Sequence, residues 1–200
     1  IVGDQIIKDH PSDTIILDNQ RASYEPVKKL ISLGHTKIAI ITGGIDHYTS
    51  QQRLNGYEKA LRECHLPIYK HYIQCGNYST EGGYEAMMKL AKLPDPPTAV
   101  FISNYDMEIG AYIAINNLNL KIPEDISLIG FDNLPLVNIV NPPLSFSEQP
   151  TDEMGLTAAK LLYRRMLGDQ SDYPKTLIHA PLFHYTDSIC SPLDKERVRL

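Results

Sequence analysis

A strand, helix, strand pattern over residues 98–133 constrains the fold of this chain more than any other stretch. Two short apolar runs, 99–102 and 126–129, flank a segment whose apolar residues recur at helical spacing. This order predicts a βαβ unit, in which a right-handed crossover helix joins two parallel strands. Polar residues follow each run, Asn104 and Tyr105 after the first and Asp132 after the second. Because ligands bind at the carboxyl ends of strands in open parallel sheets, a binding site is expected there.

The same alternation of short strands and longer helices continues through most of the chain. Apolar runs predict further strands at residues 1–3, 14–17, 38–41, 71–75, 144–146, 176–178 and 182–184. Helical spacing predicts helices over residues 21–33, 50–64, 79–91 and 151–167. Ser79 and either Thr151 or Asp152 are expected to cap helix starts, and Gly34 and Gly168 to end helices. The pattern predicts the α/β class with a doubly wound parallel sheet, in one large domain or in two lobes.

Composition limits the possible partners. The net charge of −5 and the pI near 5.8 argue against direct binding of nucleic acid, since that affinity depends on Lys and Arg. Cys64, Cys75 and Cys190 have no CxxC spacing and are interpreted as reduced thiols of a cytosolic protein. No apolar run is long enough for a transmembrane helix, so no membrane partner is expected. The chain opens at Ile1 inside a predicted strand, which we interpret as an N-terminally incomplete fragment.

Sequence motifs for catalysis and for cofactors are absent. The chain has no GxGxxG, GxxxxGK[ST], GxSxG or HExxH motif, and its seven histidines are scattered. We therefore expect no metal site and no cofactor, and a binding function rather than an enzymatic one. A Rossmann-like enzyme is a minor alternative, which a test with nucleotide cofactors would decide.

The candidate binding residues are polar side chains at or near predicted strand ends. Carboxylates, amides and an arginine recognise sugar hydroxyls, because they accept and donate hydrogen bonds in fixed geometry. The candidates are Asp4, Asp18, Arg53, Asn104, Tyr105, Asp132 and Gln149. Tyrosine and phenylalanine rings could cover the apolar face of a sugar, with Tyr48, Tyr78, Tyr105, Phe131 and Phe146 as candidates. Taken singly, each polar residue is also compatible with a helix cap, a turn or an ion pair.

Several phrases together resemble the lac repressor and galactose repressor family of bacterial transcription regulators. Residues 122–133 read IPEDISLIGFDN, which is the most specific phrase. Residues 30–39 (LISLGHTKIA) and 53–61 (RLNGYEKAL) are similar to two further family segments, and Pro142-Pro143-Leu144 with Gln149-Pro150 completes the pattern.

The resemblance implies a periplasmic-binding-protein-like type I effector domain, with doubly wound parallel sheets in two lobes and a small molecule, often a sugar, between them. By matching motif positions, Arg53, Asn104, Asp132 and Gln149 would contact the ligand, and Asp4 would join them from the other lobe. The N-terminal lobe would be incomplete here. Residues 1–17 and 149–179 would belong to it, and 18–148 and 180–200 to the C-terminal lobe and tail.

Two segments depart from the family pattern. Residues 104–108 read Asn-Tyr-Asp-Met-Glu, whereas the family usually has Asn-Asp-x-Met-Ala, so Tyr105 stands where an Asp is common. Residues 144–146 read Leu-Ser-Phe in place of Leu-Thr-Thr, which puts an aromatic ring near the expected cleft. Both departures are expected to alter ligand preference.

The resemblance implies the effector-binding and dimerising part of a cytoplasmic transcriptional repressor. Such a protein would form a homodimer or higher homo-oligomer and bind operator DNA only through an N-terminal domain that this chain lacks. An exported sugar-binding protein of a transport system is the alternative with the same fold. The residues before Ile1 would discriminate the two, since a helix-turn-helix indicates the regulator and a signal peptide the transport protein.

Overall fold

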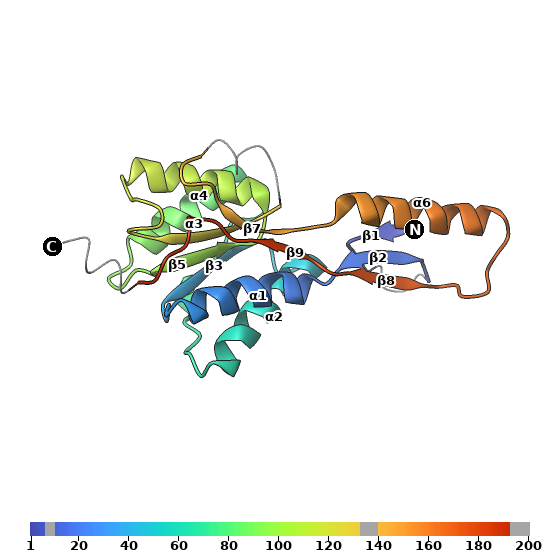
Figure 1. The fold of residues 1–200 in the computed structure, drawn as a ribbon, viewed down its shortest axis with the longest axis horizontal. Coiled ribbons are helices and arrows are strands. Elements are labelled where there is room, and N and C mark those ends of the chain that lie inside the picture. The colour runs from blue at the N-terminus through green and yellow to red at the C-terminus, as the bar shows by residue number, and fades with distance from the viewer. Residues whose placement is uncertain (7–10, 133–139, 193–200) are drawn as a thin grey trace.

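The computed structural model describes residues 1–6, 11–132 and 140–192 and shows two α/β parts (Figure 1). The predicted βαβ unit lies in the larger part and is confirmed. It consists of β5 (Ala99–Ile102), α4 (Tyr105–Asn117) and β6 (Ser127–Phe131), and β5 and β6 pair in parallel.

The larger part contains a six-stranded sheet in the order β4-β3-β5-β6-β7-β9. Its other strands are β3 (Ile38–Thr42), β4 (Ile73–Cys75), β7 (Ser145–Glu148) and β9 (Leu182–His184). Every neighbouring pair is parallel except β7 with β9, which is antiparallel. The parallel strands bring their carboxyl ends to one edge of the sheet, as predicted.

Helices cover both faces of this sheet, which confirms the doubly wound α/β architecture (Figure 1). Ile38 and Ile40 of β3 pack in one core with α1 (Asn19–Ser32) and α2 (Tyr48–Glu63). Ala39 and Ile41 pack in a second core with α3 (Thr80–Ala91) and α4. Successive side chains of a strand point to opposite faces, so one apolar run supplies both cores. Burying each isoleucine stabilises the fold by roughly 1.5–3 kcal/mol.

Helix termini follow the local sequence in most places. The Ser79 hydroxyl caps α3 by accepting from the Gly82 N–H at 3.1 Å, as predicted. The Asp18 carboxylate accepts from the Arg21 N–H at 3.0 Å, so α1 begins two residues earlier than the apolar spacing indicated. Gly34 and Gly168 have φ values of +98° and +85° and follow α1 and α6 (Thr151–Met166), as expected for helix ends.

One predicted cap is absent, and one predicted strand begins later than expected. No side chain caps α6 (Thr151–Met166), which begins after Pro150, so neither Thr151 nor Asp152 has the expected role. Residues 71–75 are not one strand, because a 3-10 turn, η1 (Lys70–Tyr72), precedes β4. The Tyr72 ring is buried in the core of α3 and α4 and its hydroxyl donates to the Asp95 carbonyl at 2.9 Å. This anchoring accounts for the turn.

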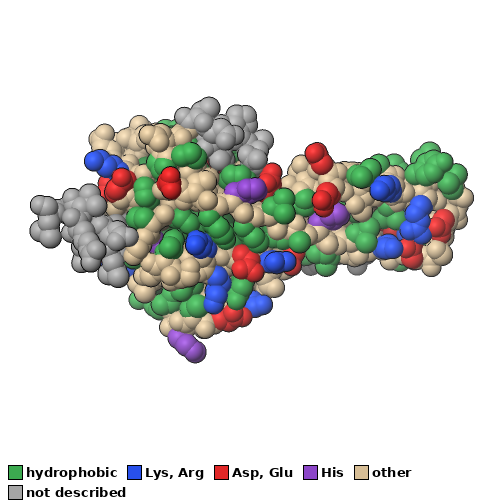
Figure 2. Space-filling view, in the orientation of Figure 1, with side chains coloured by type: hydrophobic (Ala, Val, Ile, Leu, Met, Phe, Trp, Pro, Cys, Tyr) green, Lys and Arg blue, Asp and Glu red, His purple; other side chains and the backbone are tan. Residues whose placement is uncertain are grey.

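The smaller part contains a parallel sheet in the order β1-β2-β8 with α6 beside it. Its strands are β1 (Val2–Gly3), β2 (Thr14–Leu17) and β8 (Thr176–His179). Five large hydrophobic side chains of α6 and β8 are more than half exposed: Leu156, Leu162, Tyr163, Met166 and Ile178. Figure 2 shows hydrophobic side chains over α6.

The two parts do not coincide with continuous halves of the chain. The smaller part takes β1 and β2 from residues 1–17 and α6 and β8 from residues 149–179, whereas β9 pairs in the larger sheet. The exact lobe boundaries stay a prediction. Most of the C-terminal tail, residues 193–200, lies outside the described residues. Within the described residues, no helix combines the length and apolar character needed to cross a membrane.

Candidate functional site

A cleft of about 880 Å³ lies between the smaller part and the start of α2. Its lining comes from the end of β1 and the segment after it, from the residues that precede and begin α2, and from one tyrosine after β4: Gly3, Asp4, Gln5, Ile6, Asp46, His47, Tyr48, Thr49, Gln51, Gln52 and Tyr78. Carboxylates, amides and hydroxyls predominate, and two tyrosine rings accompany them. The cleft therefore offers the groups that bind a polar ring compound.

Asp4 joins the cleft to a buried network. It directly follows β1 with a φ of +48°, a conformation that Asp adopts more readily than most residues. Its Oδ1 accepts from the Asn19 side-chain amide at 2.8 Å and from the Leu17 N–H at 3.2 Å. Asn19 Oδ1 in turn accepts from Arg53 Nε at 2.8 Å. A continuous hydrogen-bond chain thus runs from the smaller part to α2 in the larger part.

Arg53 is the buried cation of this network. Its guanidinium also donates to the Ser103 carbonyl at the end of β5, and its Nη2 lies 3.7 Å from Asp4 Oδ2. One face of the guanidinium lies over the Phe131 ring, with 3.7 Å from Cζ to the ring centroid. Burial lowers the pKa of Arg53, and the charges of Asp4 and Asp132 oppose that effect. The contacts hold the guanidinium in a fixed orientation.

Asp132 and Gln149 form a second contact at the same edge of the sheet. The Gln149 amide donates to both carboxylate oxygens of Asp132 at 3.1 Å, and the Asp132 N–H donates to the Ser147 carbonyl at 2.7 Å. Burial raises the pKa of Asp132, whereas the bond from Gln149 and the charge of Arg53 act in the opposite direction. Asp132 has a φ of +74°, so its backbone is held in a conformation that is rare for a non-glycine residue.

The remaining two predicted residues lie at the start of α4. Asn104 is its N-cap, and its side-chain oxygen accepts from the Met107 N–H at 3.3 Å. Tyr105 is the first helical residue and is half-buried. Of the six predicted residues, the structure thus joins Asp4 with Arg53 and Asp132 with Gln149, and places Asn104 next to Ser103, which contacts Arg53. Asp18 is committed to capping α1.

The predicted aromatic residues divide into two groups. Tyr48 and Tyr78 line the cleft. Phe131 is fully buried against Arg53, and Phe146 is stacked on His184 with the ring centroids 4.5 Å apart. These two phenylalanines therefore contribute to the structure around the site rather than to an open ring-binding surface.

Sequence reasoning missed two features of the site. Asn19, buried at the start of α1, connects Asp4 with Arg53. The only indication of this role in the sequence was the position of Asn19 beside Asp18 after a predicted strand. The Tyr78 hydroxyl bonds with those of Thr49 and Ser50, and the His47 ring meets the tyrosine ring edge-on. A Cβ at Gly43 would lie 2.1 Å from the Tyr78 ring, so the glycine permits this approach.

Three buried hydroxyls at this edge of the sheet have hydrogen-bonding groups that no described residue uses. Thr42, Ser103 and Ser147 lie at the carboxyl ends of β3, β5 and β7, and their hydroxyls have no hydrogen-bond partner in the described part of the chain. Among the same residues, no group of three or more His, Cys, Asp or Glu side chains is arranged to hold a metal ion.

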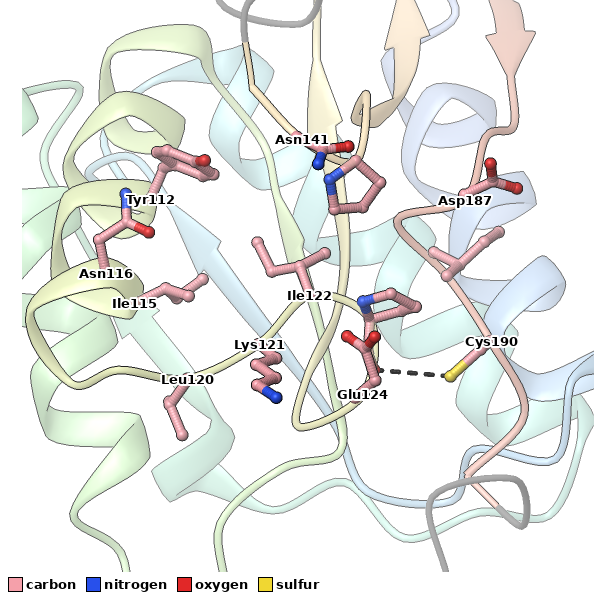
Figure 3. Close-up of a pocket in the computed structure, with 13 residues that line it drawn as sticks. Tyr112, Ile115, Asn116, Leu120, Lys121, Ile122, Glu124, Asn141, Asp187 and Cys190 are labelled. Carbon is pink, nitrogen blue, oxygen red and sulfur yellow. Dashed lines mark hydrogen bonds between the residues drawn. The ribbon is translucent and has the colours of Figure 1, made fainter. Parts of the chain in front are cut away.

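A second cavity, of about 680 Å³, lies at the opposite end of β6 and β7. Figure 3 shows Tyr112 and Asn116 of α4 on one side of it and Asp187 and Cys190 on the other. None of the six predicted ligand residues lines it.

Comparison with known proteins identifies the family. A family model described as a periplasmic binding protein-like domain matches residues 27–184. The chain is 41% identical over 162 residues to the probable HTH-type transcriptional repressor ExuR of Bacillus subtilis, covering 81% of this chain and 49% of that protein. It is 40% identical over 155 residues to the HTH-type transcriptional repressor CytR of Escherichia coli K12, covering 78% and 46%.

A solved structure shows the same fold. It is a LacI family transcriptional regulator from Enterococcus faecium with bound ribose, which is 28% identical with a TM-score of 0.86 and covers 95% of this chain and 70% of that chain. The chain spans about half the length of the curated relatives it matches. It belongs to the periplasmic binding protein-like domain family, in which its relatives are LacI-family transcriptional repressors.

Proposed function

We propose that this chain is the effector-binding part of a transcriptional repressor and that it binds a sugar in the cleft between its two parts. The observation that carries this proposal is the hydrogen-bond chain Asp4–Asn19–Arg53, which reaches from the cleft lining into the larger part. Ligand contacts are assigned to Asp4, which lines the cleft, and to Arg53, Asn104, Tyr105, Asp132 and Gln149, which are not among the residues lining it. A relative of the same fold holds ribose, which supports a sugar.

The mechanism follows from the position of the cleft. A ligand that contacts Asp4 on the smaller part and the Arg53 region on the larger part stabilises the arrangement in which both are close. It shifts the equilibrium only by its difference in affinity between the two arrangements. The changed geometry would then be passed to a DNA-binding segment outside this chain, through which the protein contacts operator DNA.

The assembly and compartment belong to the same proposal. We place the protein in the cytoplasm as a homodimer or higher homo-oligomer, in keeping with a repressor role. We also assign residues 1–17 and 149–179 to an N-terminal lobe and residues 18–148 and 180–200 to a C-terminal lobe. The repressor relatives favour this interpretation over an exported sugar-binding protein of a transport system.

Calorimetric titration of the intact protein with a panel of sugars, ribose among them, tests the ligand class. We expect saturable binding of at least one sugar and a large loss of affinity in Asp132→Asn. The matched control is Asp95→Asn, which breaks an exposed pair with Lys37 and should bind normally. Equal affinity in the wild type and in Asp132→Asn would contradict the site.

Repressor function needs a separate measurement. A band-shift assay of the intact protein with DNA upstream of its own gene should show a complex whose stability changes when the bound sugar is added. Sugar binding without any DNA complex would favour the transport protein instead.

A further inference from the structure

Glu108 is a fully buried carboxyl group beneath the proposed binding site. It lies in the first turn of α4 and points at the end of β6. Its Oε2 accepts from the Phe131 N–H at 3.3 Å, and its Oε1 has no hydrogen-bond partner among the described residues. A Cβ at Gly130 would lie 1.9 Å from Oε1, so the absent side chain of Gly130 makes the room for this carboxyl.

The electrostatic surroundings favour the protonated form. Burial raises the pKa of Glu108 to about 8, the Phe131 N–H acts in the opposite direction, and the Asp132 charge raises it further. β5 and β6 carry no titratable side chain. The helices at this position carry Tyr105, Asp106 and Tyr112 on α4 itself and Glu81, Tyr84, Glu85 and Lys89 on α3, which packs against α4.

Glu108 contacts the backbone that orients two parts of the site. Its partner Phe131 stacks on Arg53 at 3.7 Å, and the next residue is Asp132 with a φ of +74°. A displacement of the Phe131 backbone would therefore change the position of the Arg53 guanidinium and of the Asp132 carboxylate together.

We propose that Glu108 is a positioning residue of the ligand site, which holds the Phe131–Asp132 backbone in place while protonated and releases it on ionisation. The neutral acid accepts from Phe131 and buries no charge. The ionised form buries a carboxylate that makes no ion pair with any described residue and lies near Asp132, which is costly unless water enters or the carboxyl moves. The Phe131 N–H favours the ionised form but is outweighed by burial, so the carboxylate gains free energy by moving toward water and away from the Phe131 N–H. The ligand part of this inference rests on the proposed function, whereas the coupling to Phe131 does not.

The coupling between the ionisation of Glu108 and the Phe131 backbone is tested without ligand, by selective ¹⁵N-phenylalanine labelling of the intact protein. This chain has four phenylalanines, and Phe131→Leu assigns the signal of interest. We expect the Phe131 amide to shift with a midpoint near pH 8, the value for Glu108. Glu108→Gln, which stays neutral, should abolish the shift, and the exposed Asp106→Asn two residues away should retain it. A wild-type amide that does not titrate, or a titration that persists in Glu108→Gln, would overturn the proposal.

The effect on the ligand is measured by ribose calorimetry over the same pH range. If binding requires the protonated form, affinity falls by up to about tenfold per pH unit above the midpoint in the wild type and stays level in Glu108→Gln. A pH-independent wild-type affinity overturns the link to binding. Absence of ribose binding at every pH instead counts against ribose as the sugar that this site binds, and the ligand-free amide titration still decides the role of Glu108.

Discussion

The guanidinium of Arg53 lies over the ring of Phe131, with 3.7 Å between Cζ and the ring centroid. The same guanidinium bonds with Asn19 from α1 and with the Ser103 carbonyl at the end of β5. Protein groups from three elements therefore fix its orientation before any ligand arrives. Such preorganisation reduces the conformational entropy that a ligand must overcome on binding.

Arg53→Lys should lower both stability and affinity. A lysine ammonium cannot donate to Asn19 and Ser103 in the fixed fork of a guanidinium, so one buried acceptor loses its partner. We expect the free energy of unfolding to fall by about 2 kcal/mol, measured by urea denaturation. Arg62→Lys, at an exposed pair with Glu58, is the control and should change it by less than about 0.5 kcal/mol. Equal stability of the two variants would show that the buried contacts contribute little.

Gly130→Ala tests the close approach of Glu108 to β6. The added methyl would lie within about 2 Å of the Glu108 carboxyl, and overpacking of this kind destabilises by about 1–3 kcal/mol. Glu108→Ala removes the obstructing carboxyl, so the double variant should be more stable than the two single effects predict. Urea denaturation of all four proteins gives the coupling free energy. Simple additivity would mean that the two side chains do not meet.

The pKa of Glu108 predicts a loss of stability as pH rises. The folded-state value of about 8 lies above the usual value of 4.5, so the folded state holds more protons between these two values. This contribution to stability is fully present below about pH 4.5 and is lost as pH rises through about 8. Relative to Glu108→Gln, the free energy of unfolding of the wild type should fall by about 3 kcal/mol between pH 4.5 and 7. Urea denaturation across this range measures the difference, and parallel pH profiles of the two proteins would contradict it.

The sequence predicted those elements whose signal is local. The apolar runs of β3, β5 and β6, the helical spacing of α4 and the Ser79 cap each depend on residues close together in the chain. The turn at Lys70–Tyr72 was missed because Tyr72 is anchored to Asp95, a contact that spacing does not reveal. The antiparallel pairing of β9 with β7 could not be predicted from local patterns either, because α6 and β8 separate the two strands in the sequence.

In the candidate site, too, some residues could be predicted from the sequence, whereas others could be found only in the packed structure. Strand-end position and family resemblance singled out Arg53, Asp132 and Gln149, and their roles as ligand contacts stay a prediction. Asn19 gave no comparable signal, and Glu108 stood out only as a departure from the Ala that the family usually has there. Asn19 matters because α1 and α2 pack side by side, and Glu108 is buried because its helix position faces Gly130. A polar side chain near a helix start is usually solvated or a cap, so only the packed structure reveals these two roles.

Asp13→Asn should weaken the smaller part, and the loss should depend on pH. Asp13 is 2% exposed and accepts from Arg165 Nε and Nη2 at 2.7 and 2.9 Å and from the Lys175 N–H at 2.9 Å, which ties α6 and the entry of β8 to β2. The hydrogen bonds from Arg165 lower the pKa of Asp13. Its contribution is therefore present above the unfolded-state pKa of about 3.9 and is lost as pH falls through the lower folded-state value.

At neutral pH the variant replaces a charge-assisted acceptor by an amide that presents N–H groups to Arg165. We expect a loss of about 2 kcal/mol in the free energy of unfolding at pH 7. Acid denaturation followed by circular dichroism should show wild type and variant converging as pH falls through the lowered folded-state pKa of Asp13, because protonation removes the same charge from Asp13. Asp95→Asn is the matched control, since Asp95 pairs with Lys37 at an exposed position and such a pair contributes little to the free energy of unfolding. Two acid-denaturation curves that keep a constant separation at every pH would show that the Asp13 charge does not fasten α6 to the sheet.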